Sequence, residues 1–255
     1  MEKESHQLIK IALMEESPTG PAFDLTRRRA LLLGGSAALI GAAEFLFPNL
    51  ADAASAGKDI SHGSRTNPQV ALTFHGAGEI SLARELLALS KKTHTPITVM
   101  AVGAWLNAHP TIGHEILDGG HELGNHTLNH KTMTTLSLHQ ASAEVSKGRA
   151  ALIKSVGSAG KLFRPSGTPK SNAIIRKAAG AAGYAHCITF DVDTLDYQDP
   201  SPAAIIENCL RSVRNGSIIS LHFGHPHTVK AFPSLIQALH DRKLTPVTIS
   251  KLLHT

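Results

Sequence analysis

The chain has 255 residues, of which 42% are hydrophobic and 18% charged, so it can build a globular core and wholesale disorder is excluded. Two cysteines exclude a disulfide scaffold and a four-cysteine zinc site, and 4% aromatic residues argue against a large aromatic binding platform. The net charge of +5 is accompanied by no arginine-rich helix, zinc finger or base-stacking motif, so nucleic acid is not an expected partner. Histidine, with 16 residues, is the outlier and points to metal binding or acid–base chemistry.

The first 56 residues have the pattern of an export signal. Arg27–Arg29 precede a mildly apolar stretch that ends near Phe47 and is short for a membrane span. Small residues at 51–53 and 54–56 then fit the sites that signal peptidases cut. We therefore expect a twin-arginine-type signal peptide over 1–56, a linker over 57–69 and an exported domain over 70–255 with no stable membrane span after cleavage. An uncleaved N-terminal membrane anchor is the alternative.

From residue 70 onward, short apolar runs typical of buried strands alternate with helical periodicity. The predicted order is strand 70–74, helix 81–92, strand 97–102, helix 105–117 with Pro110 near a helix start, strand 121–125, helix 137–156, strand 161–164, helix 172–182, strand 186–191, helix 202–213, strand 217–223, helix 228–239 and strand 246–249. Six or seven such units imply a parallel sheet in an α/β fold. The pattern is compatible with an open sheet and with a closed barrel.

In parallel α/β folds, the chemistry gathers at the carboxyl ends of the strands. Five predicted strand ends carry histidine, aspartate or arginine, a concentration that packing does not explain: His75, His126 with His130, Arg164, Asp193 and His222. Each is ambiguous alone. One helical turn would aim His126 and His130 at one metal ion, but such a pair also arises by chance on a solvated helix face. Asp193 alone is equally a helix cap and Arg164 a surface turn, whereas a buried His222 needs a partner.

Together these positions resemble the motifs of the polysaccharide deacetylase family, carbohydrate esterase family 4, over roughly Val70–Thr255. His126–His130 resembles the metal motif His-(Ser/Thr)-x-x-His, and Arg164–Gly167 resembles the Arg-x-Pro motif of the groove. Asp193–Tyr197 resembles Asp-x-x-Asp-Trp, with Tyr in place of Trp, and Ser220–His222 resembles the Leu-x-His strand end. The resemblance implies a distorted (β/α) barrel of about seven units, the NodB-like fold. It also implies divalent-metal-dependent hydrolysis that removes acetyl groups from a glycan, as an amide or an ester.

The first family motif, Thr-Phe-Asp-Asp, is altered in this chain. Its aspartates serve in the family as the catalytic base and the third metal ligand, whereas residues 73–76 here are Thr-Phe-His-Gly. Three outcomes are open. His75 is the third ligand beside His126 and His130, or His75 is the base while two histidines hold the metal with water or Glu79, or the site is inactive.

The resemblance also implies roles for the other residues. His222 would donate a proton to the departing amine, and Asp193 would orient and charge its imidazole. Arg164 would pair with the family's base carboxylate, and because that carboxylate is absent here, substrate or another acid becomes its partner. The expected cofactor is a divalent ion, foremost Zn²⁺, and the expected substrate is an acetylated glycan outside the cytoplasm or in the cell wall.

Two other functions are compatible with these residues: a catalytically impaired carbohydrate-binding homologue, and an amide hydrolase acting on a small non-sugar compound. Outside the cytoplasm, Cys187 and Cys209 would either form one disulfide or stay separate as buried thiols. His225 and His227 lie close to His222 in the sequence, and lining a sugar groove is a simpler account of them than a second metal cluster.

Overall fold

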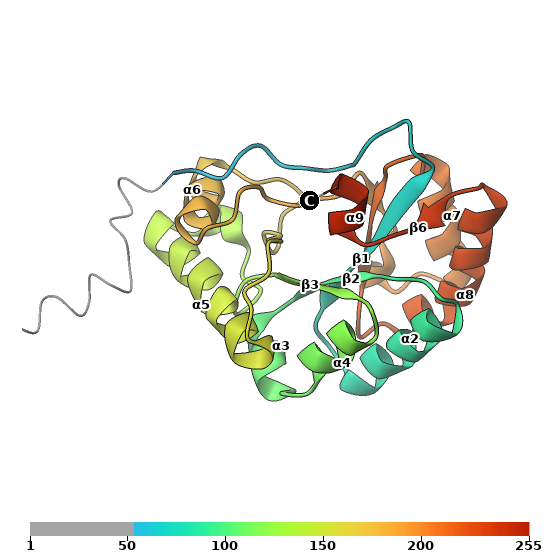
Figure 1. Ribbon diagram of the computed structural model, residues 1–255, viewed down its shortest axis with the longest axis horizontal. Helices are drawn as coiled ribbons and strands as arrows, with labels where there is room; N and C mark the ends of the chain where they lie inside the picture. The colour runs from blue at the N-terminus through green and yellow to red at the C-terminus, as the bar shows by residue number, and fades with distance from the viewer. Residues whose placement is uncertain (1–53, 255) are drawn as a thin grey trace, which may run out of the picture. The chain divides into compact units, whose positions relative to one another are not determined.

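The computed structural model describes residues 54–254, so nearly all of the predicted leader lies outside the described residues (Figure 1). In this part of the chain, no helix is long and apolar enough to cross a membrane. The expected linker, 57–69, lies against the domain. The Gly57 N–H donates to the Ala185 carbonyl (2.7 Å), Ile60 pairs with Ile188, and residue 69 already belongs to the first strand.

The core is a parallel sheet, as the continuous apolar runs predict. Its strands follow the order β3-β2-β1-β5-β4, with β6 paired to the start of β1. Their bounds are β1 Gln69–Gly76, β2 Thr98–Ala101, β3 Glu122–Asn125, β4 Val192–Asp193, β5 Ile218–His222 and β6 Thr245–Pro246. Helices surround these strands in Figure 1, and the α/β prediction is confirmed.

Two predicted strands, 161–164 and 186–191, are not regular strands, and this prediction was wrong. Phe163 makes a single bridge to Asn125, and Ile188 a single bridge to Ile60. Pro165 has no N–H, so a ladder cannot continue past Arg164. Backbone hydrogen bonds nevertheless connect β3 to β5 through these segments. The Arg164 N–H donates to the Asn125 carbonyl (2.9 Å), the Ile188 N–H to the Phe163 carbonyl (2.8 Å) and the Asp191 N–H to the Ile218 carbonyl of β5 (3.2 Å). These irregular segments form the distorted side of the barrel.

The helices follow the predicted order with two corrections. They are α2 Ile80–Lys92, α3 Gly103–Ala108, α4 Ile112–Asp118, α5 Leu138–Val156, α6 Ala173–Ala181, α7 Pro202–Ser212, α8 Pro226–Asp241 and α9 Ile249–Leu253. The predicted helix 105–117 is two helices, because Pro110 excludes helical geometry from His109 (φ −130°, ψ 75°). The predicted strand 246–249 ends at Pro246, and Thr248 caps α9 by accepting the Lys251 N–H.

Alternation along β1 decides which residues face the barrel interior. Val70, Leu72 and Phe74 belong to the large cluster between the strands and the helices, whereas Ala71 packs with inward-facing residues of other strands. His75 has the same parity as Ala71, so it lies inward at the carboxyl end of β1. The same parity on β5 turns His222 inward, and the register pairs it with His75.

Candidate active site

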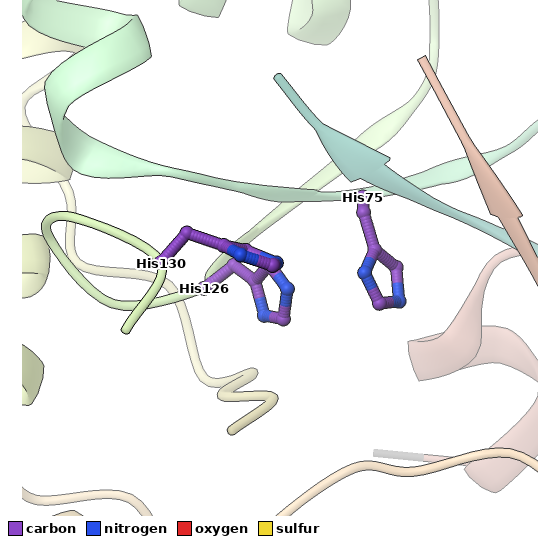
Figure 2. A group of neighbouring side chains, drawn as sticks. All are labelled: His75, His126 and His130. Atoms are coloured by element: carbon purple, nitrogen blue, oxygen red, sulfur yellow. The ribbon is translucent and has the colours of Figure 1, made fainter. Parts of the chain in front are cut away.

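Three histidines from two segments converge at the carboxyl ends of the strands. Figure 2 shows His126 and His130 on one loop, across from His75 at the end of a strand. One ring nitrogen of each lies within 4.8 Å of those of the other two. Zinc–nitrogen bonds of about 2.0–2.1 Å in tetrahedral geometry place ligand atoms about 3.4 Å apart. The cluster is therefore of metal-site size, somewhat wider than a closed tetrahedral site.

The loop that carries His126 and His130 is not the helical turn that their spacing suggested. Thr127 and His130 have left-handed backbone angles, φ 68° and φ 56°, which are rare for residues other than glycine. Two side chains hold this shape: Asn125 Oδ1 accepts the Thr127 N–H (2.9 Å), and the Thr127 hydroxyl accepts the His130 N–H (3.2 Å). Residues held in such conformations cluster at functional sites.

The ring nitrogens of His126 and His75 fit metal ligation. His126 Nδ1 is 2.9 Å from the Arg164 carbonyl oxygen, so it carries the proton, while its Nε2 is buried without a partner. His75 Nδ1 is likewise buried and unpartnered. Burial lowers the pKa of both imidazoles well below 6.5, and their histidine neighbours lower it further. Neutral rings with a free lone pair are the form that binds a metal, and buried polar atoms rarely lack partners.

Half-buried His222 pairs with the fully buried Asp196, which lies within the Asp193–Tyr197 motif and had no role predicted from the sequence. The rings of His75 and His222 are 4.2 Å apart between centroids. Asp196 Oδ1 accepts from His222 Nδ1 (2.7 Å), and Oδ2 accepts the His222 N–H (2.7 Å) and the Thr228 hydroxyl (2.7 Å). Asp196 is fully buried, and among the described residues its carboxylate hydrogen-bonds His222 and Thr228 only. The signal was available, because Asp196 is the second acid of the same motif.

The expected partnership between Asp193 and His222 is therefore corrected. Asp193 Oδ1 accepts the Leu195 N–H (3.0 Å). Leu195 is left-handed (φ 55°), and the turn that it makes leads into a short helix over Asp196–Gln198. That turn brings the second acid of the motif, not the first, to the imidazole. The Asp193 charge acts instead on Arg164, where it partly opposes the lowering of the pKa by burial.

Arg164 is 1% exposed, which rules out the surface-turn interpretation. Its Nε donates to the Ile188 carbonyl (3.3 Å) and Nη2 to the Thr189 carbonyl (3.1 Å), while Nη1 is buried without a partner. No carboxylate among the described residues hydrogen-bonds the guanidinium. Burial lowers the pKa of Arg164 to about 9, and Asp193 partly opposes this.

The remaining predicted residues lie outside the cluster. Glu79 is exposed before α2 and is not among the grouped ligands. The ring centroid of His225 is 6.0 Å from that of His222. The ring centroid of Tyr197, a residue 47% exposed, is 5.4 Å from that of His222. The two cysteines are separate buried thiols.

Comparison with known proteins agrees with this architecture. The family model described as polysaccharide deacetylase matches residues 62–187. A solved structure, "T48 deacetylase with substrate", is 32% identical with a TM-score of 0.66, covering 73% of this chain and 91% of that one. The chain belongs to the polysaccharide deacetylase family. A structure described as a CE4 family pseudoenzyme from Bacillus anthracis has a TM-score of 0.72 at 23% identity, covering 79% of this chain and 70% of that one, and shares the fold.

Two curated relatives span most of the domain. A chitooligosaccharide deacetylase of Rhizobium leguminosarum bv. phaseoli is 28% identical over 211 residues, covering 75% of this chain and 91% of that protein. The uncharacterized protein YlxY of Bacillus subtilis is 26% identical over 194 residues, which are 76% of this chain. This chain spans only 60% of the length of YlxY.

Proposed function

We propose that this chain is a metal-dependent hydrolase that removes acetyl groups from an N-acetylated glycan. The observation that carries the proposal is the convergence of three histidine ligand atoms within 4.8 Å, next to the His222–Asp196 pair. The names of relatives that act on chitooligosaccharide and on peptidoglycan N-acetylglucosamine support the substrate class. We also propose that the domain is exported behind a signal peptide over 1–56, because such glycans lie outside the cytoplasm.

His75, His126 and His130 would hold the divalent ion, with Zn²⁺ favoured by an all-imidazole donor set. A bound ion of this kind polarises a carbonyl oxygen and lowers the pKa of a coordinated water. The hydrogen bond from His126 Nδ1 to the Arg164 carbonyl fixes the ring so that Nε2 faces the centre. His75 is assigned as a ligand because its Nδ1 lacks any other partner.

His222 would hold the proton that the leaving group needs. Its Nδ1 hydrogen bond to Asp196 leaves Nε2 as the nitrogen that exchanges a proton with substrate. With Nδ1 held by the buried Asp196 carboxylate, a proton on Nε2 would face the substrate. In the overall reaction, the water oxygen bonds to the acyl carbon, the C–N bond breaks, and the His222 Nε2 proton passes to the departing amine nitrogen. One proton of the water restores the His222 imidazole, and the other is released when acetic acid leaves as acetate.

A second function, glycan binding without hydrolysis, is favoured by one observation. Neither carboxylate of the family's first motif is present, and a side chain at Gly76 has no room: its Cβ would lie 2.8 Å from Val99 Cγ1 and 3.1 Å from Ala101 Cα. This function keeps the histidine cluster as a relic or a structural metal site.

Metal content and acetate release test both functions on the domain after the leader. We expect about one ion per chain, lost in His75→Ala and in His126→Ala but kept in His139→Ala, an exposed histidine on α5. Retention by His75→Ala would assign His75 as the base. Metal uptake and glycan binding without acetate release would favour the non-catalytic function, and failure of the wild type to take up metal would refute the proposal.

A further inference from the structure

A cavity rich in arginine lies at the opposite end of the strands from the histidine cluster. It has a volume of about 420 Å³ and is lined by Arg65, Val213, Arg214, Asn215, Arg242 and Leu244. Each of these residues precedes a strand: Arg65 comes before β1, Arg214 before β5 and Arg242 before β6. Because β1 has eight residues, the cavity and His75 are roughly 20 Å apart. The cavity is thus separate from the active site.

Two of the three guanidinium groups are held in place by the protein. Arg65 Nη2 pairs with Asp191 Oδ2 (2.7 Å), and Nη1 donates to the Asn215 carbonyl (2.8 Å). Arg242 Nη1 donates to the Leu210 carbonyl, which leaves its Nε and Nη2 without partners among the described residues. Guanidinium groups fixed in this way lose little freedom when they bind an anion.

The Arg214 side chain is exposed, and its guanidinium has no hydrogen-bond or ion-pair partner among the described residues. Among the residues that the structure describes, no acidic side chain lines the cavity, and Asp191 behind Arg65 offsets only one of the three positive charges. The cavity therefore has two positive charges in excess, with donors of the fork geometry that suits phosphate and carboxylate.

We propose that this cavity binds the phosphodiester groups of a polyol-phosphate polymer. Phosphodiesters present repeated single negative charges with several acceptor oxygens, which match guanidinium groups supplied by three separate loops. The apolar floor of Val213 (9% exposed) and Leu244 (5% exposed) suits the carbon chain between phosphates. The lining contains no aromatic residue on which a base would stack, so the polyol polymer is favoured over nucleic acid. Such a site would hold the enzyme on an anionic surface while the histidine end stays free.

Binding to a short oligo(glycerol phosphate) tests the proposal, measured by calorimetry on the whole domain. Arg214→Ala is the main variant, because the exposed Arg214 side chain makes no hydrogen bond or ion pair with the described residues that its removal would break. We expect it to weaken binding about tenfold, and Arg214→Ala with Arg242→Ala to weaken it further, with less salt dependence. Arg211→Ala is the matched control: it removes an arginine of α7 that pairs with Glu207 (3.8 Å) outside the cavity, and we expect wild-type affinity.

Further probes decide the ligand chemistry. A poly-glutamate of equal charge that binds as tightly as the phosphate oligomer would overturn the phosphate assignment, because general polyanion attraction would then suffice. An oligonucleotide of equal charge that binds more tightly would overturn the choice of a polyol polymer. Equal affinity of the wild type and Arg214→Ala would overturn the site itself. Metal content is independent of these results, because the histidine cluster lies at the other end of the barrel.

Discussion

Replacing Asp196 by asparagine tests whether this buried carboxylate controls the proton on His222. The carboxylate accepts three hydrogen bonds of 2.7 Å each, from the His222 N–H, the His222 ring and the Thr228 hydroxyl. An amide has one oxygen, and its NH₂ group only donates. If the amide oxygen of asparagine accepts from the His222 N–H and the Thr228 hydroxyl, its NH₂ group faces His222 Nδ1. Two donors cannot bond each other, so the ring has to move its proton from Nδ1 to Nε2.

The structure sets the size of the effect. One charge-assisted hydrogen bond is lost in a fully buried place, which we expect to lower the free energy of unfolding by about 1.5–3 kcal/mol. The acceptor that holds the His222 proton on Nδ1 is also lost. A positioned general acid contributes about 10²–10⁴-fold to rate, so acetate release should fall within that range if His222 is the acid.

Urea denaturation, acetate release and ring-nitrogen NMR of His222 measure these effects. Asp193→Asn is the matched control, because the Asp193 carboxylate accepts the Leu195 N–H and not the imidazole. We expect Asp196→Asn to change the His222 tautomer and Asp193→Asn to leave it unchanged. An unchanged His222 spectrum in Asp196→Asn, or a larger change in Asp193→Asn, would refute the assignment.

Other consequences are equally testable. Gly76→Asp should destabilise the domain by about 1–3 kcal/mol, because its Cβ would meet Val99 and Ala101, whereas His75→Asp should fold; equal urea midpoints for the two variants would contradict this. The metal-free domain should lose stability as pH falls below about 6.5, by about 1.4 kcal/mol per pH unit for each histidine that stays neutral when folded. Stability falls with falling pH because burial lowers the folded-state pKa of His75 and His126, so the unfolded chain binds more protons than the folded one. The His75→Ala variant should therefore show a weaker dependence of stability on pH. Burial raises the pKa of Cys187 and Cys209 to about 12, so a thiol reagent should label both only after denaturation, and a disulfide seen by mass spectrometry would contradict the structure.

The regular part of the fold was predictable because local sequence determines it. Apolar runs bounded by polar residues mark β1, β2 and β5, and the capping box of Ser137 and Gln140 marks the start of α5. The segments 161–164 and 186–191 are equally apolar, but they pair through single bridges. Pairing partners are distant in sequence, so apolar content alone did not show where a ladder would be interrupted.

The site was predictable in its residues and less so in its contacts. Strand-end position selected His75 and His222, and the β1–β5 register that places them side by side appears only in the folded chain. The loop from His126 to His130 depends on a left-handed threonine, a conformation that β-branched residues rarely adopt and that the sequence does not signal. Spacing alone therefore suggested a helix where the chain forms a strained loop.

Asp193 acts on the Arg164 guanidinium and Asp196 on the His222 imidazole. This division explains how the site tolerates the loss of the carboxylates of the family's first motif. Arg164 is a buried guanidinium with no carboxylate within hydrogen-bonding distance among the described residues, and an uncompensated buried charge costs several kcal/mol. Asp193 opposes that cost electrostatically, while Asp196, three residues on, is committed to His222. Had Asp193 paired with the imidazole, the guanidinium would have no nearby acid to offset its burial. The division of the two carboxylates thus offsets the burial of Arg164 and holds the half-buried His222 beside a histidine at position 75.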